Sequence, residues 1–199
     1  MTEEPRAQTR RPDDVEQWAA ARTLADLGEL TARWLEGSLG YQPAFEGERP
    51  SASEPRVPAL IAANRAGFVT HYSQSGLALD EGRGQQRAVV CGFGAEETMH
   101  RIGRALLGTD LVALVYPPGG RLDGLQIPVS VSGGLVGTWA GAEMPVADIV
   151  EYFGGDCHRL AVEALCASWQ ATLFDPHWGR DDLLWDRLRA VADEARPSG

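Results

Sequence analysis

Two groups of residues in the chain could bind a ligand or take part in catalysis, and the first lies where two predicted strands end or begin. Ser73 and Gln74 follow the end of one strand, Gln86 and Arg87 begin the next, and His71 lies slightly further inside the first strand. If the strands are neighbours, these side chains meet at one sheet edge. Amides hydrogen bond to planar polar groups, and Arg binds carboxylate or phosphate with paired hydrogen bonds. The pattern predicts a polar-ligand site, although such residues also serve simply as turns.

The second group follows the last predicted strand, at residues 175–180. Asp175 and His177 are separated by one residue and are candidates for an acid/base pair. Trp178 offers a face for stacking, with the Arg180 guanidinium beside it. The same segment also suits structural roles, with the Trp in the core, the Gly in a turn and an Asp capping the next helix. The sequence leaves both interpretations open.

No motif in the chain specifies a metal, a cofactor or an activated nucleophile. Cys157, His158 and Cys166 are close in sequence, but their spacing matches no zinc site. Cys91 lies in an apolar strand, where a buried thiol is inert. The glycine pairs belong to no phosphate-binding fingerprint, and there is no nucleophile elbow. We therefore predict no metal site, and the sequence specifies neither a cofactor nor a reaction.

The elements that must position these residues begin with two helices. Residues 24–36 have helical apolar spacing that ends at Gly37. Thr23 and Asp26 resemble a capping box at the start of this helix. A shorter helix is predicted to begin near Asp13.

The remainder of the chain mixes short helices and strands. Further helices are predicted at residues 60–64, 95–107, 146–152 and 160–166 and from 181 or 182, and strands at 68–72, 86–93, 111–116, 127–132, 135–140 and 170–174. Gly133 and Gly134 predict a hairpin between two of these strands. The mixture indicates an α+β or α/β fold, with a mixed sheet of about five to six strands packed with helices.

The length of 199 residues suits one domain. We predict a disordered tail at residues 1–12 and a single globular domain at 13–195. Residues 37–56 are rich in Gly, Pro, Ser and Glu and predict a long loop within that domain.

Composition restricts the partners. The formal net charge is −10, and all 18 basic residues are Arg, so binding to nucleic acid is disfavoured. No apolar run approaches the roughly 20 residues that cross a bilayer, and the N-terminus has no apolar signal segment. The three cysteines are few, odd in number and without C-x-x-C spacing, which is typical of reduced thiols. We expect a soluble, cytoplasmic protein that does not bind membranes.

Longer motifs occur in three parts of the chain. They read Thr-Leu-Ala-Asp-Leu-Gly-Glu-Leu at 23–30, Ser-Gln-x-Gly at 73–76 with Gln-Gln-Arg-Ala at 85–88, and Trp-Gly-Arg-x-Asp-Leu-Leu-Trp at 178–185. Together they resemble an uncharacterised actinomycete protein family of unknown function. The resemblance covers nearly the whole chain and implies no activity. One departure is Ser75, where the family has Pro after the Ser-Gln pair.

Two functions follow as alternatives. The first is binding of a small polar ligand, with an enzymatic role left open, in a strand-end pocket lined by His71, Ser73, Gln74, Gln86 and Arg87 and closed by Asp175, Trp178 and Arg180. The second is an accessory or regulatory role through a protein–protein interface on the acidic surface. A concave site would favour the first, and a pocketless surface with an exposed apolar patch would favour the second.

Overall fold

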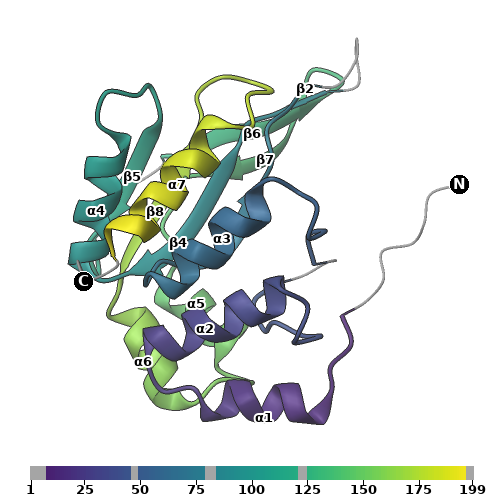
Figure 1. The fold of residues 1–199 in the computed structure, drawn as a ribbon, viewed down its shortest axis with the longest axis vertical. Coiled ribbons are helices and arrows are strands. Elements are labelled where there is room, and N and C mark those ends of the chain that lie inside the picture. Colours follow the sequence, from purple (N-terminus) through teal and green to yellow (C-terminus); the bar gives the residue numbers. More distant parts are fainter. Residues whose placement is uncertain (1–7, 46–48, 79–83, 121–124, 196–199) are drawn as a thin grey trace, which may run out of the picture.

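Two antiparallel four-stranded sheets form the framework of the computed structural model, which describes residues 8–45, 49–78, 84–120 and 125–195 (Figure 1). Sheet A has the order β1-β4-β8-β5, with β1 at Val69–Gln74, β4 at Val89–Gly94, β5 at Val112–Tyr116 and β8 at Trp169–Phe174. Sheet B has the order β2-β3-β6-β7, with β2 at Leu77–Ala78, β3 at Gln85–Gln86, β6 at Ile127–Ser132 and β7 at Leu135–Ala140. The chain is therefore an α+β domain.

The helices form two groups around sheet A, and the two groups pack against each other through one helix of each (Figure 1). One group contains α3 (Arg56–Arg65), α4 (Glu96–Leu106) and α7 (Leu183–Glu194), in which α7 packs against both others and the three cover one face of the sheet. The other contains α1 (Pro12–Ala20), α2 (Leu24–Leu35), α5 (Val146–Phe153) and α6 (Arg159–Cys166), which gather at the lower end of the view. Part of the second face of sheet A is left to the candidate site.

The predicted start of α2 is confirmed by its hydrogen bonds. The Thr23 hydroxyl accepts from the backbone N–H of Asp26 at 3.1 Å, and the Asp26 carboxylate accepts from the N–H of Thr23 at 3.0 Å. These bonds complete a capping box, which satisfies backbone donors that a helix start otherwise leaves free. The helix buries Leu27, Leu30 and Trp34 in the core.

The predicted hairpin is β6–β7, with the predicted strand limits. Gly133 and Gly134 have φ angles of 57° and 79°, a conformation that only glycine adopts without strain. Trp139 pairs with Pro128 and Ala140 pairs with Ile127. Ile127 and Ala140 pack against the apolar cluster that contains Val89 and Phe174, so this end of the hairpin lies against sheet A.

The predicted strand at 86–93 is divided between the two sheets. Gln86 pairs with Ser130 in sheet B, whereas Val89 pairs with Phe174 in sheet A. Between them the Arg87 N–H donates to the Val129 carbonyl. The strand changes hydrogen-bonding partners at this point, so the framework has two antiparallel sheets where the pattern suggested one mixed sheet.

Alternation in sheet A separates a core face from the candidate-site face. Val90 and Leu173 are opposite each other and belong to the main hydrophobic cluster. Cys91 and Thr172 are also opposite each other and point to the other face. Where the two sheets meet, Val89, Val129 and Phe174 form a smaller apolar cluster.

The N-terminal residues and the long loop are described in part. Residues 1–7 of the predicted tail and 46–48 of the predicted loop lie outside the described residues. Residues 37–45 and 49–55 form no helix or strand, and Asp14 holds this segment by accepting from the Gly40 N–H at 2.8 Å. No helix in the described ranges is long and apolar enough to cross a membrane.

Candidate functional site

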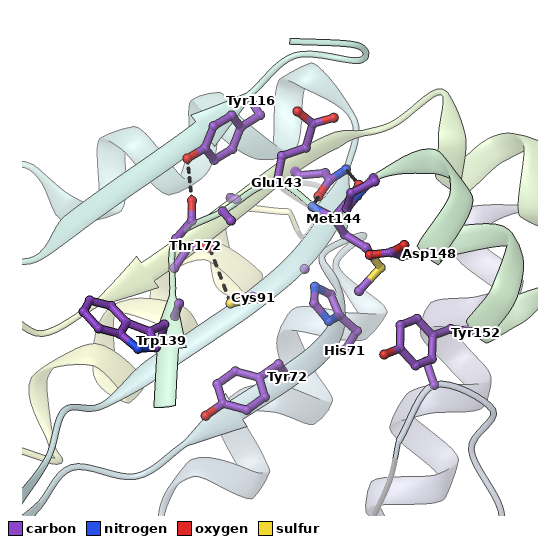
Figure 2. Close-up of a pocket in the computed structure, with 18 of the residues that line it drawn as sticks. His71, Tyr72, Cys91, Tyr116, Trp139, Glu143, Met144, Asp148, Tyr152 and Thr172 are labelled. Carbon is purple, nitrogen blue, oxygen red and sulfur yellow. Dashed lines mark hydrogen bonds between the residues drawn. The ribbon is translucent and has the colours of Figure 1, made fainter. Parts of the chain in front are cut away.

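A cavity of about 500 Å³ opens on the face of sheet A that α3, α4 and α7 do not cover (Figure 2). Sheet A forms its floor, and the segment between β7 and α5, together with α5 itself, forms a wall. It is lined by Ala44, Phe45, His71, Tyr72, Ser73, Cys91, Gly92, Tyr116, Gln126, Trp139, Ala140, Gly141, Ala142, Glu143, Met144, Pro145, Asp148, Tyr152, Gln170, Ala171 and Thr172. The size and the mixture of apolar and polar groups are those of small-molecule sites.

An irregularity in β1 brings two consecutive side chains to this cavity. Thr70 is opposite Gly92 and Tyr72 is opposite Cys91, so His71 is an extra residue in the strand. A bulge of this kind redirects side chains and is common beside functional sites. Because of it, both His71 and Tyr72 line the cavity, whereas regular alternation would direct only one of them there.

The His71 ring is the polar group best placed to meet a ligand. It packs against Phe93, with 5.1 Å between ring centroids, and it forms no hydrogen bond to any described residue. Burial lowers the pKa of His71 to about 4, because desolvation disfavours the imidazolium. At neutral pH the ring is uncharged and offers one donor and one acceptor.

The thiol on the cavity floor is protonated at neutral pH. Cys91 Sγ lies 3.4 Å from Thr172 Oγ1, and burial raises the pKa of Cys91 to about 11. The reactive species of a cysteine is the thiolate. Cys91 therefore contributes a weakly polar surface and is not an activated nucleophile.

Hydrogen bonds to sheet A fix the wall of the cavity. The Tyr116 hydroxyl donates to the Gly141 carbonyl. The Gln170 amide bonds Met144 twice, accepting from its N–H at 2.8 Å and donating to its carbonyl at 2.9 Å. The segment that carries Glu143 is thereby held against the sheet, and a ligand would meet a preformed wall.

The two polar motifs predicted from the sequence do come together, at the junction between the sheets. The Arg87 guanidinium lies over the Trp178 ring, 4.1 Å from its centroid. The Gly179 N–H donates to the Gln86 carbonyl at 2.9 Å, and the Gly76 N–H donates to Asp181 at 2.6 Å. The two motifs are therefore in contact at this junction, and a shared ligand pocket between them stays a prediction.

Most polar atoms at this junction already bond to the chain itself. Gln74 Nε2 donates to the carbonyls of Arg87 and Val129, at 3.1 and 2.9 Å. Arg87 donates to the carbonyls of Pro176 and Pro128, at 3.2 and 2.8 Å. These bonds hold the two sheets together. A role of the junction residues in ligand binding stays a prediction.

The candidate acid/base residues lie in an ion-pair network beside this junction. Asp175 is fully buried, and its carboxylate accepts from Arg180 Nε and, at 2.9 Å, from the backbone N–H of His177. The His177 ring instead contacts Asp110, at 2.7 Å. Hydrogen bonding by Arg180 lowers the pKa of Asp110 to about 2. The Asp175 carboxylate thus orders the turn after β8 and does not bond to the His177 ring.

The structure divides the predicted site residues into two places. His71 and Ser73 line the cavity, whereas the others lie at the junction: Gln74, Gln86, Arg87, Asp175, His177, Trp178 and Arg180. Sequence reasoning did not select Glu143, Asp148 or Tyr152. The four-residue spacing of Asp148 and Tyr152 on a predicted helix was a visible signal that they share one face. Nothing in the sequence around Glu143 indicated its position, which depends on tertiary contacts.

No group of three His, Cys, Asp or Glu side chains in the described part of the chain is arranged to hold a metal ion. A family model described as a domain of unknown function (DUF6919) matches residues 13–194. No curated protein matches the chain.

Proposed function

The chain belongs to this family of domains of unknown function, and we propose that it binds a small polar organic molecule in the cavity on sheet A. The observation that carries the proposal is the His71 ring, which lines a cavity of about 500 Å³ without a hydrogen-bonding partner among the described residues. Polar groups inside proteins usually have partners. A ligand that hydrogen bonds to this ring would satisfy it.

The remaining lining supports binding of a molecule with an apolar body. Phe45, Met144 and Trp139 supply apolar and aromatic surface, and the wall is held by Gln170. Few, well-placed polar groups on a largely apolar surface fix the orientation of a small ligand. Since the Cys91 thiol is not activated, the lining favours non-covalent binding over covalent catalysis.

Thermal-shift screening of amino acids, amines, nucleosides and sugars tests the proposal. We expect some compounds to raise the melting temperature of the wild type, because a ligand that binds only the folded state stabilises it. His71→Leu removes the hydrogen-bonding ring, and His100→Leu is the matched control, since His100 is exposed on α4 away from the cavity. The shifts should shrink in H71L and persist in H100L. An absence of hits, or equal shifts in both variants, would reject the cavity as the binding site.

The edge of sheet B favours a second candidate, a protein–protein interface. In the described part of the chain β7 pairs with β6 alone, and Leu135 and Trp139 on it are 76% and 51% exposed. A free strand edge with apolar side chains can pair with a strand of another chain. This surface suits an accessory or regulatory protein.

Partner capture with two baits tests this alternative. Leu135→Lys places a charge on the β7 edge, and Leu107→Lys is the control, because Leu107 is 74% exposed away from that edge. Loss of a captured protein with L135K alone would support the interface. Identical capture by the wild type and both variants would exclude it.

We also propose a cytoplasmic location, because Cys91, Cys157 and Cys166 are all free thiols. Free cysteines persist in reducing compartments. Fractionation of cells tests this proposal, and recovery of the chain in a secreted fraction would contradict it.

A further inference from the structure

We propose that the ligand carries a cationic nitrogen, an ammonium or amidinium group, which Asp148 and Tyr152 hold at the α5 side of the cavity, while Glu143 adds negative charge from the segment before α5. This inference rests on the proposed function and specifies the chemistry of the same site. It starts from the charges of the lining. Among the described lining residues the charged side chains are Glu143 and Asp148, and both are carboxylates.

These two carboxylates are unusual among the partly buried carboxylates of the described residues, because they have no partner. Neither accepts a hydrogen bond nor forms an ion pair with a described residue, although both are partly buried. The other partly or fully buried carboxylates of the described chain all have partners: Asp14, Glu54, Asp156, Asp175 and Asp181. Partly buried charge without a partner is unfavourable, and a ligand cation would relieve this.

Local helix stability explains only one of the two positions. Asp148 lies in the first turn of α5, where a carboxylate interacts favourably with the helix dipole. Glu143 precedes the helix, on the segment that Gln170 and Tyr116 fix to sheet A. Its charge raises the pKa of Tyr116, after the larger effect of burial, and Figure 2 shows its carboxylate on the Tyr116 side of the cavity, away from Asp148 and Tyr152.

Aromatic and neutral polar groups complete a site suited to a cation. Figure 2 shows Tyr152 and Asp148 extending from α5 on the same side of the cavity as His71. The face of an aromatic ring attracts a cation within about 6 Å of its centroid. The His71 ring, uncharged at neutral pH, accepts a hydrogen bond from an N–H without repelling the positive charge.

Three indole compounds of similar shape and different charge test the inference. Tryptamine is cationic at neutral pH, tryptophol is neutral and indole-3-acetate is anionic. Calorimetric titration at low salt would give the Kd of each compound for the full chain. We expect tryptamine to bind about tenfold or more tightly than tryptophol, and indole-3-acetate to bind most weakly, because unscreened carboxylates attract the first and repel the last.

Charge-neutralising variants connect this preference to the cavity. In Glu143→Gln with Asp148→Asn, the ratio of the tryptophol Kd to the tryptamine Kd should fall towards one, with tryptophol binding retained. Glu151→Gln with Asp13→Asn is the matched control, because it removes an exposed α5 carboxylate and another first-turn Asp away from the cavity. This control should keep the wild-type ratio, which excludes an effect of net charge alone.

Two results would overturn the inference. Equal affinities of tryptamine and tryptophol, both weakened by H71L, would refute the cation while leaving the proposed function intact. Preference for tryptamine that survives E143Q with D148N would place the cation elsewhere. Failure of the proposed function is recognised separately, by a thermal-shift screen without any hit that depends on His71.

Discussion

At the scale of single residues, His71 connects the shape of β1 to the chemistry of the cavity. The extra residue in the strand directs the ring into the cavity, and the ring finds no partner among the described residues. His71 could be predicted as a site residue from the sequence, because it lies on a predicted strand next to polar residues. The bulge itself could not be predicted, since it depends on how β1 pairs with β4.

The lowered pKa of His71 predicts a pH dependence of stability. The pKa is about 4 in the folded chain, against about 6.5 for an unperturbed His. Below about pH 6.5 the unfolded chain takes up a proton that the folded ring does not. The free energy of unfolding therefore decreases as the pH falls towards 4. Between pH 7 and 4.5 the free energy of unfolding should decrease by up to about 2.5 kcal/mol more in the wild type than in H71L. The difference is smaller where water partly solvates the ring. Urea unfolding at both pH values measures this, and equal losses would contradict it.

Asp175 and Arg180 form a second residue-scale feature, with a structural effect. Arg180→Ala would leave the fully buried Asp175 carboxylate without its charged partner, which we expect to cost about 2 to 3 kcal/mol. Arg189→Ala removes an exposed partner of Asp186 and should change stability by less than about 0.5 kcal/mol. Chemical denaturation measures both variants. Similar small effects would show that Arg180 does not stabilise the buried carboxylate.

At the scale of elements, local signals predicted most helices and the hairpin. The capping box at Thr23 and the glycine pair at 133–134 act over a few residues, and both have the predicted structure. The division of the strand at 86–93 had no local signal. It depends on partners far away in sequence, Ser130 for Gln86 and Phe174 for Val89.

Two glycine substitutions test how closely the elements pack. A Cβ on Gly76 would lie 2.1 Å from the Arg180 carbonyl oxygen, so Gly76→Ala should separate the two motifs and destabilise the fold by about 1 to 3 kcal/mol. A Cβ on Gly103, in α4, would meet nothing within 4 Å. Gly103→Ala should therefore stabilise the chain by about 0.5 to 1 kcal/mol through helix propensity. Thermal unfolding compares them, and a neutral G76A would contradict the close approach.

At the scale of the whole molecule, the cavity exists because three parts of the fold meet without filling the space between them. Sheet A supplies the floor, α5 one side, and the segment after β7 the wall. Most of the polar residues that the sequence predicted as a ligand site lie at the junction between the sheets. There their hydrogen bonds hold the two sheets together. The cavity lining could not be predicted in the same way, because Glu143 lies on a segment that is fixed by the bond of Gly141 to Tyr116 and the bond of Met144 to Gln170.

The most direct test of the central claim is to map the binding of the strongest screening hit by ¹⁵N–¹H NMR of the full chain. We expect the largest shift changes at the backbone amides of His71, Gly141 and Met144, which surround the cavity. Changes confined to Arg87 and Trp178 would place the site at the junction between the sheets instead. Changes confined to β7, or none, would contradict a ligand-binding cavity on sheet A.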